Sequence, residues 1–220
     1  MSAEVAIWDA IDEFVEARTG LCLDTLPGEM RRHVVSAAMQ GAGVPGPRAY
    51  LERLQLDPRA FDDLIAKLTI PETYFFRDAA MFTSLRTEFI PELFRLRGAT
   101  HRLRIWSAGC ASGEEPYSLA ILLDQLGEGG RAHLLLGSDL SRPVVERARH
   151  GDYGAWSLRA VSKRVISEYF EKTPHGFRLD ARICGMVQFH HHNLADRGSR
   201  RRFREKSASI SSCAGMSSSI

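Results

Sequence analysis

The feature that most constrains the fold is the stretch from Arg104 to Ala120, which reads RIWSAGCASGEEPYSLA. A short apolar run, typical of a buried strand, ends at Gly109, and an amphipathic helix is predicted from Glu114 to Leu126. Gly109 permits a tight turn and lets a ligand approach without a Cβ in the way. The spacing is G-x-x-x-G, unlike the dinucleotide fingerprint. The turn suits a polar part of a nucleotide-like ligand, and a purely structural turn is the open alternative.

A second strand-like run, Leu134 to Leu140, carries Asp139 near its end, thirty positions after Gly109. In doubly wound folds an acidic residue there accepts hydrogen bonds from ribose hydroxyls. The alternative is that Asp139 caps the helix predicted from Pro143 to His150. The two features together favour an adenosine-type ligand more than either does alone.

The remaining pattern predicts helices first and alternating strands and helices later. Such alternation indicates a parallel sheet with right-handed crossovers. The other predicted helices are 5–15, 30–39, 49–54, 58–69 and a longer connecting helix, 82–96. A third strand is predicted at 186–194, and short strands of a small β-subdomain at 176–179 and 182–184.

Composition excludes several classes of protein. Of 220 residues, 44% are apolar and 25% charged, with a formal net charge of +2, so nothing argues for nucleic acid or a membrane surface. No apolar run approaches the roughly 20 residues of a membrane-spanning helix. The four cysteines are scattered, which indicates reduced thiols and a cytoplasmic protein, and no metal site is expected.

Several motifs, in order along the chain, resemble those of the CheR-type chemotaxis receptor methyltransferases. Ser107 to Ala120 resembles the cofactor loop of that family, and Glu72 to Asp78 (ETYFFRD) resembles its T-x-F-F-R signature. Similarity continues at 151–153 and 158–159, and at Phe189 with Asn193 and Leu194. The resemblance covers roughly residues 5 to 196, and this collinearity is more specific than any single motif.

The resemblance implies an α/β fold. It is a Rossmann-like class I methyltransferase sheet that binds S-adenosylmethionine, preceded by a small all-helical domain. The implied domains are a receptor-docking helical domain at 1–78, a linker helix at 79–100 and a truncated methyltransferase domain at 101–196. The implied activity is methylation of glutamate side chains of chemotaxis receptors by a cytoplasmic monomer that docks on receptor helices.

The resemblance also implies roles for individual residues. Thr73 and Arg77 contact the methionine end of the cofactor, and Arg77, the expected catalytic residue, also aligns the acceptor carboxylate. Gly109 forms the cofactor turn, and Glu115 lies against the amino group of the cofactor. Asp139 holds the ribose. Asn193 and Leu194 flank the adenine.

Basic residues of the helical domain are candidates for the receptor-docking face, although a solvated helix face explains them equally well. These residues are Arg31, Arg32, His33, Arg48 and Arg53.

The reaction demands little chemically, because a glutamate with an ordinary pKa of about 4.3 is already an ionised nucleophile. The protein must position the reactants, and an arginine beside the acceptor suits that need. For Arg77 the alternative is a surface ion pair with Asp78 or Glu72. The aromatic pair Phe75–Phe76 directly before it favours a partly buried position instead.

The C-terminal segment departs from the family, which continues after Asn193-Leu194 with a buried strand of the form F-D-x-I-x-C-R-N-V-x-I-Y. Here Ser209 to Ile220 reads SISSCAGMSSSI, within a tail at 197–220 that looks aberrant or disordered. Suitable codons for this peptide, read one base earlier, encode FDLILCRNVLIY. The sequence therefore predicts a frameshift, real or from sequencing error, between about Asp196 and Ala208. We also expect the truncated chain to be poorly stable, with little or no activity.

Two alternatives to this function stay open. The chain is then either a non-catalytic module that binds a signalling partner through its helical domain, or a related methyltransferase with another acceptor.

Overall fold

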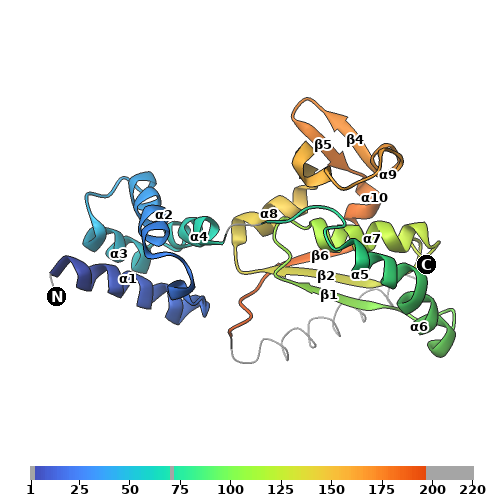
Figure 1. The fold of residues 1–220 in the computed structure, drawn as a ribbon, viewed down its shortest axis with the longest axis horizontal. Helices are drawn as coiled ribbons and strands as arrows, with labels where there is room; N and C mark the ends of the chain where they lie inside the picture. The colour runs from blue at the N-terminus through green and yellow to red at the C-terminus, as the bar shows by residue number, and fades with distance from the viewer. Residues whose placement is uncertain (1–2, 70–71, 197–220) are drawn as a thin grey trace, which may run out of the picture. The chain divides into compact units, whose positions relative to one another are not determined.

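The computed structural model describes residues 3–69 and 72–196, so the tail predicted to be aberrant lies outside the described residues. The chain forms two compact units. One comprises Met1–Pro71 with Leu140–Pro143, and the other Glu72–Asp139 with Val144–Ile220 (Figure 1). A search of the described helices finds none long and apolar enough to cross a membrane.

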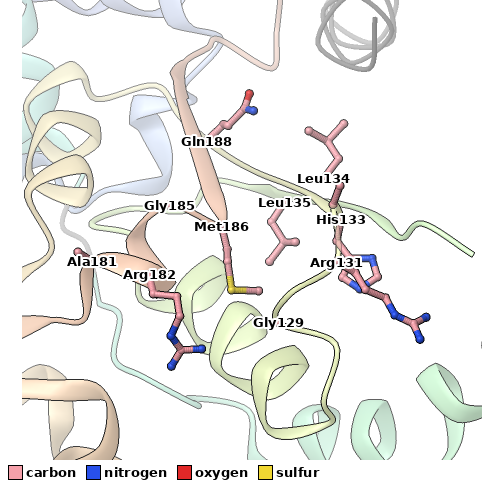
Figure 2. Close-up of a pocket in the computed structure, with 11 residues that line it drawn as sticks. Gly129, Arg131, His133, Leu134, Leu135, Ala181, Arg182, Gly185, Met186 and Gln188 are labelled. Atoms are coloured by element: carbon pink, nitrogen blue, oxygen red, sulfur yellow. The ribbon is translucent and has the colours of Figure 1, made fainter. Parts of the chain in front are cut away.

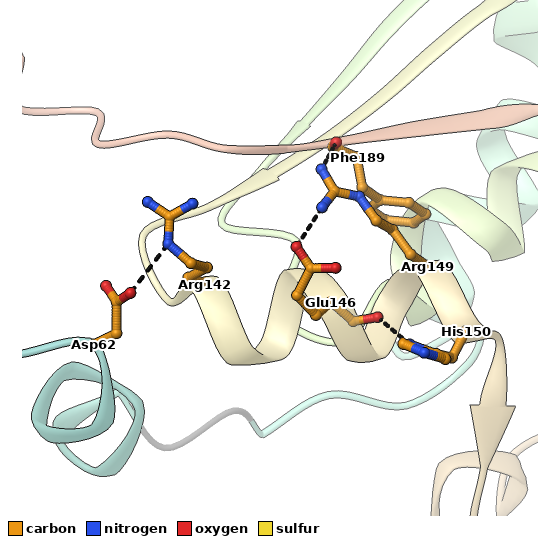
Figure 3. A network of polar contacts seen from close by, with 6 residues as sticks. All are labelled: Asp62, Arg142, Glu146, Arg149, His150 and Phe189. Carbon is orange, nitrogen blue, oxygen red and sulfur yellow. Dashed lines mark hydrogen bonds and ion pairs between the residues drawn. The ribbon is translucent and has the colours of Figure 1, made fainter. Parts of the chain in front are cut away.

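The first unit is helical, as its apolar spacing predicts. Its elements are α1 (Ala3–Thr19), the 3-10 turn Leu23–Thr25, α2 (Gly28–Gly41), α3 (Pro47–Leu56) and α4 (Pro58–Leu68). Apolar side chains from the four α-helices form one core, centred on Ile11, Val35, Leu54 and Leu64. Asp57 accepts a hydrogen bond from Arg59 N at 2.9 Å and so caps α4. In the same unit, Arg142 Nε donates to Asp62 Oδ2 at 3.0 Å (Figure 3).

The second unit contains the parallel sheet that the sequence predicts. Its strands are β1 (Arg104–Ala108), β2 (Leu134–Asp139) and β6 (Val187–His191), in the order β1-β2-β6. Ala108 pairs with Ser138, and Asp139 pairs with His191, so the three carboxyl ends lie at one edge. The crossover helices are α7 (Glu114–Gln125) and α8 (Arg142–His150). Helix α7 lies along one face of the sheet (Figure 1), where most of its side chains are buried.

Arg149 fastens α8 to the third strand. Its Nη2 donates to the Phe189 carbonyl oxygen at 2.5 Å, and its Nη1 pairs with Glu146 one turn earlier (Figure 3). His150 contacts the Glu146 carbonyl oxygen at 2.7 Å in the same view. These contacts hold the last turn of α8 against the middle of β6.

The long connecting helix expected at 82–96 is present but interrupted. It consists of α5 (Ala79–Ser84), a π-helical stretch at Leu85–Phe89 and α6 (Ile90–Arg97). The N–H of Ile90 bonds to the carbonyl of Leu85, five residues back. Pro91 follows and has no N–H to donate, which explains why the regular ladder breaks here.

A small antiparallel sheet follows α8, with the order β3-β5-β4. Its elements are β3 (Asp152–Tyr153), the 3-10 turn Ala155–Leu158, α9 (Lys163–Tyr169), β4 (Phe170–Thr173) and β5 (Gly176–Leu179). The strand expected at 176–179 is confirmed, whereas the strand expected at 182–184 is wrong. That segment is helix α10 (Ala181–Cys184), because Asp180 accepts from Arg182 N at 2.7 Å and starts a helical turn.

Candidate cofactor site

The turn after β1 lies at the carboxyl edge of the sheet. The N–H groups of Gly109 and Cys110 donate to the carbonyl oxygen of Ser138 at 2.8 and 2.9 Å, which ties the turn to β2. Gly109 has φ +75°, and a Cβ added to it would meet no atom within 4 Å. The turn therefore has the left-handed backbone that favours glycine and leaves open space above it.

Gly113 is required for a different reason. It precedes α7 with φ +91°, and a Cβ there would lie 2.9 Å from Ala148 Cβ and from Phe189 Cζ. Contacts this short do not occur without displacement of the neighbours. The second glycine of the G-x-x-x-G pattern thus permits close packing of α7 against α8 and β6.

Asp139 stands at the end of β2 and holds the turn. Its Oδ2 accepts a hydrogen bond from the backbone N–H of Ala111, which has φ +47°, at 2.9 Å. This bond joins the turn after β1 to the end of β2. The carbonyl oxygen of Asp139 accepts from His192 N at 2.8 Å, which brings the end of β6 alongside.

A second carboxyl group lies at the start of α7. Glu115 is exposed, and its Oε1 accepts a hydrogen bond from the buried Ser107 Oγ at 2.6 Å. Glu115, in the first turn of α7, and Asp139, the last residue of β2, thus both lie at the carboxyl edge of the parallel pair β1–β2.

Asn193 and Leu194 follow β6 by two and three residues, at the same edge. Asn193 is partly buried, and its Oδ1 accepts from Ala195 N at 2.9 Å, while Leu194 is exposed. Both residues therefore lie at the edge of the sheet where β1 and β2 also end.

The segment with the T-x-F-F-R signature is fastened to α7 and to the small sheet. Phe75 N donates to the Ser157 carbonyl oxygen at 2.9 Å, and Phe76 N donates to Ser118 Oγ at 2.9 Å. The fully buried Phe75 ring contacts Tyr153 edge-on, with ring centroids 4.8 Å apart. Phe76 has φ +57°, a strained conformation for a bulky residue. Partly buried Thr73 precedes this anchored pair.

The expectation that Arg77 is partly buried is wrong. Its side chain is 57% exposed, its Nη1 bonds the Glu72 carbonyl oxygen, and its Nη2 lies 4.0 Å from Glu72 Oε2. The aromatic pair turns inward at the strained Phe76 and leaves the next side chain at the surface. Beside it, the Arg159 guanidinium stacks 3.6 Å above the Tyr74 ring, and Tyr74 OH donates to the Arg77 carbonyl oxygen at 3.4 Å.

The structure thus brings Gly109, Glu115, Asp139 and Asn193 to one edge of the sheet. It places Thr73 and Arg77 in a loop that is hydrogen-bonded to α7. The sequence did not indicate that Ser112, Glu114 and Ser157 take part in the hydrogen bonds around this site. An acid directly before Glu115 was visible in the sequence, but nothing there indicated that it is buried.

A cavity of about 360 Å³ lies at the opposite, amino-terminal edge of the sheet (Figure 2). Arg131 and Arg182 are among its lining residues, and both pair with carboxylates of the same unit, Arg131 with Glu128 at 2.8 Å and Arg182 with Asp124. Within the described residues, no three His, Cys, Asp or Glu side chains group as they would around a metal ion.

Comparison with known proteins assigns the family. The family model "CheR methyltransferase, SAM binding domain" matches residues 71–204. The chain belongs to the CheR methyltransferase family. Its fold class, an α/β sheet of the class I methyltransferase type after a helical unit, is therefore confirmed, and S-adenosylmethionine is its cosubstrate.

Curated relatives in this family are moderately similar. Chemotaxis protein methyltransferase Cher2 of Pseudomonas putida is 30% identical over 196 residues, 83% of this chain and 70% of that protein. Chemotaxis protein methyltransferase 1 of Pseudomonas aeruginosa is 30% identical over 208 residues, 89% of this chain and 74% of that protein. The probable biofilm formation methyltransferase WspC of Pseudomonas aeruginosa is 31% identical, over 86% of this chain and 45% of that protein.

The residues present fit this cosubstrate. The space above Gly109 is open, and the carboxyl groups of Glu115, at the start of α7, and Asp139, at the end of β2, lie at the same edge of the sheet. The carboxyl group of Glu115 suits a cationic amino group, and that of Asp139 suits a pair of hydroxyls.

Proposed function

We propose that this chain carries the site of an enzyme that methylates glutamate side chains of chemotaxis receptors, acting as a cytoplasmic monomer on the helices of the receptor. The names of the relatives in Pseudomonas support the pathway. The observation that carries the proposal is that one helix, α7, joins both halves of the site. Its first turn bears Glu115 beside the cofactor turn, and its Ser118 holds the loop of Arg77.

The proposed roles follow from charge and placement. Glu115 binds the amino group of the cofactor, Asp139 holds the ribose, Asn193 and Leu194 flank the adenine, and Thr73 contacts the methionine end. The bound cofactor supplies a methyl group already activated on a sulfonium. The chain therefore needs no general base, and its task is to orient the acceptor carboxylate.

Arg77 is the proposed residue for that orientation, and its surface position suits an acceptor that belongs to another protein. A guanidinium binds a carboxylate through two parallel N–H groups. Its present partner, Glu72, is itself a carboxylate, 85% exposed, so an incoming glutamate exchanges one such partner for another. Arg159, which stacks on the Tyr74 ring, adds a second positive charge near Arg77.

The helical domain is the proposed docking surface for the receptor. Two of its candidate arginines bond carboxylates of the same unit, Arg31 with Asp12 at 3.2 Å and Arg53 with Asp57 at 2.8 Å. Arg32, His33 and Arg48 are exposed. These three are the better candidates for contacts with an acidic partner.

We also propose that the chain as written is destabilised because residues 209–220 read SISSCAGMSSSI in place of the apolar strand sequence of the family. A hollow of about 560 Å³ lies beside β1 and is lined mainly by apolar side chains, among them Met81, Leu93 and Ile105. Nearby, Phe89 is 61% and Leu96 64% exposed. An apolar strand placed there would remove this surface from water.

The test is methyl transfer from labelled S-adenosylmethionine to a receptor cytoplasmic fragment, with the chain as written and with a chain of restored reading frame. The proposal predicts base-labile methyl ester on glutamate with the restored chain and little or none with the chain as written. Label on another residue type would overturn the acceptor assignment. Binding of the receptor fragment without cofactor binding would favour the non-catalytic module.

A further inference from the structure

We infer that Glu114 is a positioning residue that links the cofactor turn to the loop of Arg77, so that occupancy of one site restrains the other. This inference rests on the proposed function, since it assigns the coupling between the two halves of that site. Glu114 precedes the proposed cofactor residue Glu115 but is only 2% exposed. A side chain of this type is rarely buried without a specific arrangement of partners.

The two oxygens of the Glu114 side chain bond two different segments. Oε2 accepts a hydrogen bond from Ser112 Oγ at 2.8 Å, in the cofactor turn. Oε1 accepts from Ser157 Oγ at 3.0 Å, in the 3-10 turn Ala155–Leu158. The carboxyl group therefore bridges the cofactor turn and a segment more than forty residues later.

Ser157 continues the chain of hydrogen bonds to the loop of Arg77. Its carbonyl oxygen accepts from Phe75 N at 2.9 Å, two residues before Arg77. A second branch begins at the Glu114 backbone, where the carbonyl oxygen accepts from Ser118 Oγ at 2.6 Å. Ser118 Oγ in turn accepts from Phe76 N at 2.9 Å. Both amides that anchor the loop thus depend on Glu114, one through its side chain and one through its main chain.

Tyr153 closes the network from the other side. Its hydroxyl donates to the Ser112 carbonyl oxygen at 2.8 Å, and its ring lies edge-on to Phe75. The cofactor turn and the Phe75 anchor therefore share a buried polar and aromatic core. Bonds in such a network support one another, and removing one member leaves the others unsatisfied.

The functional consequence is coupling between the cofactor turn and the loop of Arg77. A ligand that orders the turn 109–113 fixes Ser112, which fixes the Glu114 side chain. Through Ser157, Glu114 in turn fixes Phe75 and the strained Phe76 that follows it. Arg77 is then presented in one orientation when the methyl donor is in place. Coupling of this kind is reciprocal, so a fixed loop also favours cofactor binding.

The test is amide hydrogen exchange at Phe75 and Phe76 in the 220-residue chain, with and without S-adenosylhomocysteine. Ser157→Ala removes only the hydroxyl bond to Glu114 and leaves the carbonyl that Phe75 uses. We expect about tenfold faster exchange at Phe75 in this variant, the scale of one hydrogen bond. Ser167→Ala is the matched control, because Ser167 Oγ bonds only the Arg164 carbonyl oxygen at 2.8 Å in the same subdomain.

Substitution of Glu114 itself separates positioning from general loss of structure. Glu114→Gln keeps an acceptor for one serine and offers an N–H to the other, so we expect exchange near the wild-type rate. Glu114→Ala keeps neither hydrogen bond, so we expect faster exchange at Phe75 in this variant. Tyr169→Phe deletes a comparable bond, Tyr169 OH to Asp124 Oδ2 at 2.9 Å, and should lower the melting temperature without faster exchange at Phe75.

The outcomes distinguish this inference from the proposed function. Unchanged exchange at Phe75 in Ser157→Ala, or equal acceleration in the Ser167→Ala control, overturns the link. If the ligand binds and slows exchange at Phe75 equally in wild type and Ser157→Ala, the coupling is refuted. If the ligand does not bind even the frame-restored chain, the proposed function fails, while the ligand-free comparison still decides the link.

Discussion

Ser107 Oγ lies 2.6 Å from Glu115 Oε1, so a residue near the end of β1 orients a carboxyl group in the first turn of α7. Ser107 is buried and Glu115 is exposed, which means that the hydroxyl holds one oxygen from beneath. This arrangement suits a cationic amino group better than a mobile side chain would.

Ser107→Ala should therefore weaken binding of S-adenosylhomocysteine. One hydrogen bond contributes about 1 kcal/mol, so we expect an affinity loss of roughly fivefold. Glu115→Gln should lose more, because it also removes the negative charge. Isothermal calorimetry measures both. Thr83→Ala, on exposed α5, is the control and should bind as wild type does. Equal affinity in all variants would exclude Glu115 from the site.

Arg77→Ala should lower the rate of methyl transfer with little change in the melting temperature, because the side chain is largely exposed. A charge-assisted bidentate contact predicts a loss of about 10- to 100-fold. Arg77→Lys should not restore the rate, since an ammonium group lacks the planar pair of donors. The assay requires the frame-restored chain, with Arg95→Ala on α6 as the control. A fully active Arg77→Ala would remove Arg77 from catalysis.

The thiol of Cys110, in the cofactor turn, should be unreactive in the folded chain. Burial, and then the charge of Asp139, raise its pKa to about 12, so at pH 8 the thiol keeps its proton. The folded state thus binds this proton more tightly than the unfolded state does. The stability that it contributes is present below the ordinary pKa of about 8.5 and is lost as the pH rises toward 12.

Alkylation with iodoacetamide at pH 8, followed by mass spectrometry, tests the predicted low reactivity of Cys110. The exposed Cys22 should be labelled first and Cys110 only after unfolding. Labelling of Cys110 as fast as Cys22 in native conditions would contradict the buried turn.

The coding DNA should contain the strand that the peptide lacks. Read one base earlier, the codons for Ser209 to Ile220 are predicted to encode FDLILCRNVLIY, and the family match ends at residue 204, just before this segment. Sequencing the gene decides the matter. A second frame that encodes an unrelated peptide would refute the frameshift and leave the hollow beside β1 without its proposed occupant.

Most of the fold was predictable because it depends on periodicity. Apolar spacing predicted the helices of the first unit, and the runs ending at Gly109 and Asp139 predicted two adjacent parallel strands. Errors arose where one local interaction outweighs the pattern. Asp180 caps a helix where Arg182 to Cys184 resembled a strand, and Pro91 interrupts the long connecting helix.

The site was predictable only in part. The turn at Gly109 and the carboxyl group of Asp139 follow from their places after two strands. The exposure of Arg77 does not follow from its sequence, because it depends on the positive φ of Phe76. The burial of Glu114 depends on Ser157, a partner far away along the chain. Such long-range contacts leave no periodic signal.

The most direct test of the account is calorimetric titration of S-adenosylhomocysteine into the frame-restored chain and its Asp139→Ala variant. Asp152→Ala, which removes an exposed partner of Arg178 in the small sheet, is the control. The account predicts one binding site in the parent and control, and at least about tenfold weaker binding in Asp139→Ala, which loses the ribose contact and the Ala111 bond. Absence of binding in the parent, or equal affinity in Asp139→Ala, would contradict it.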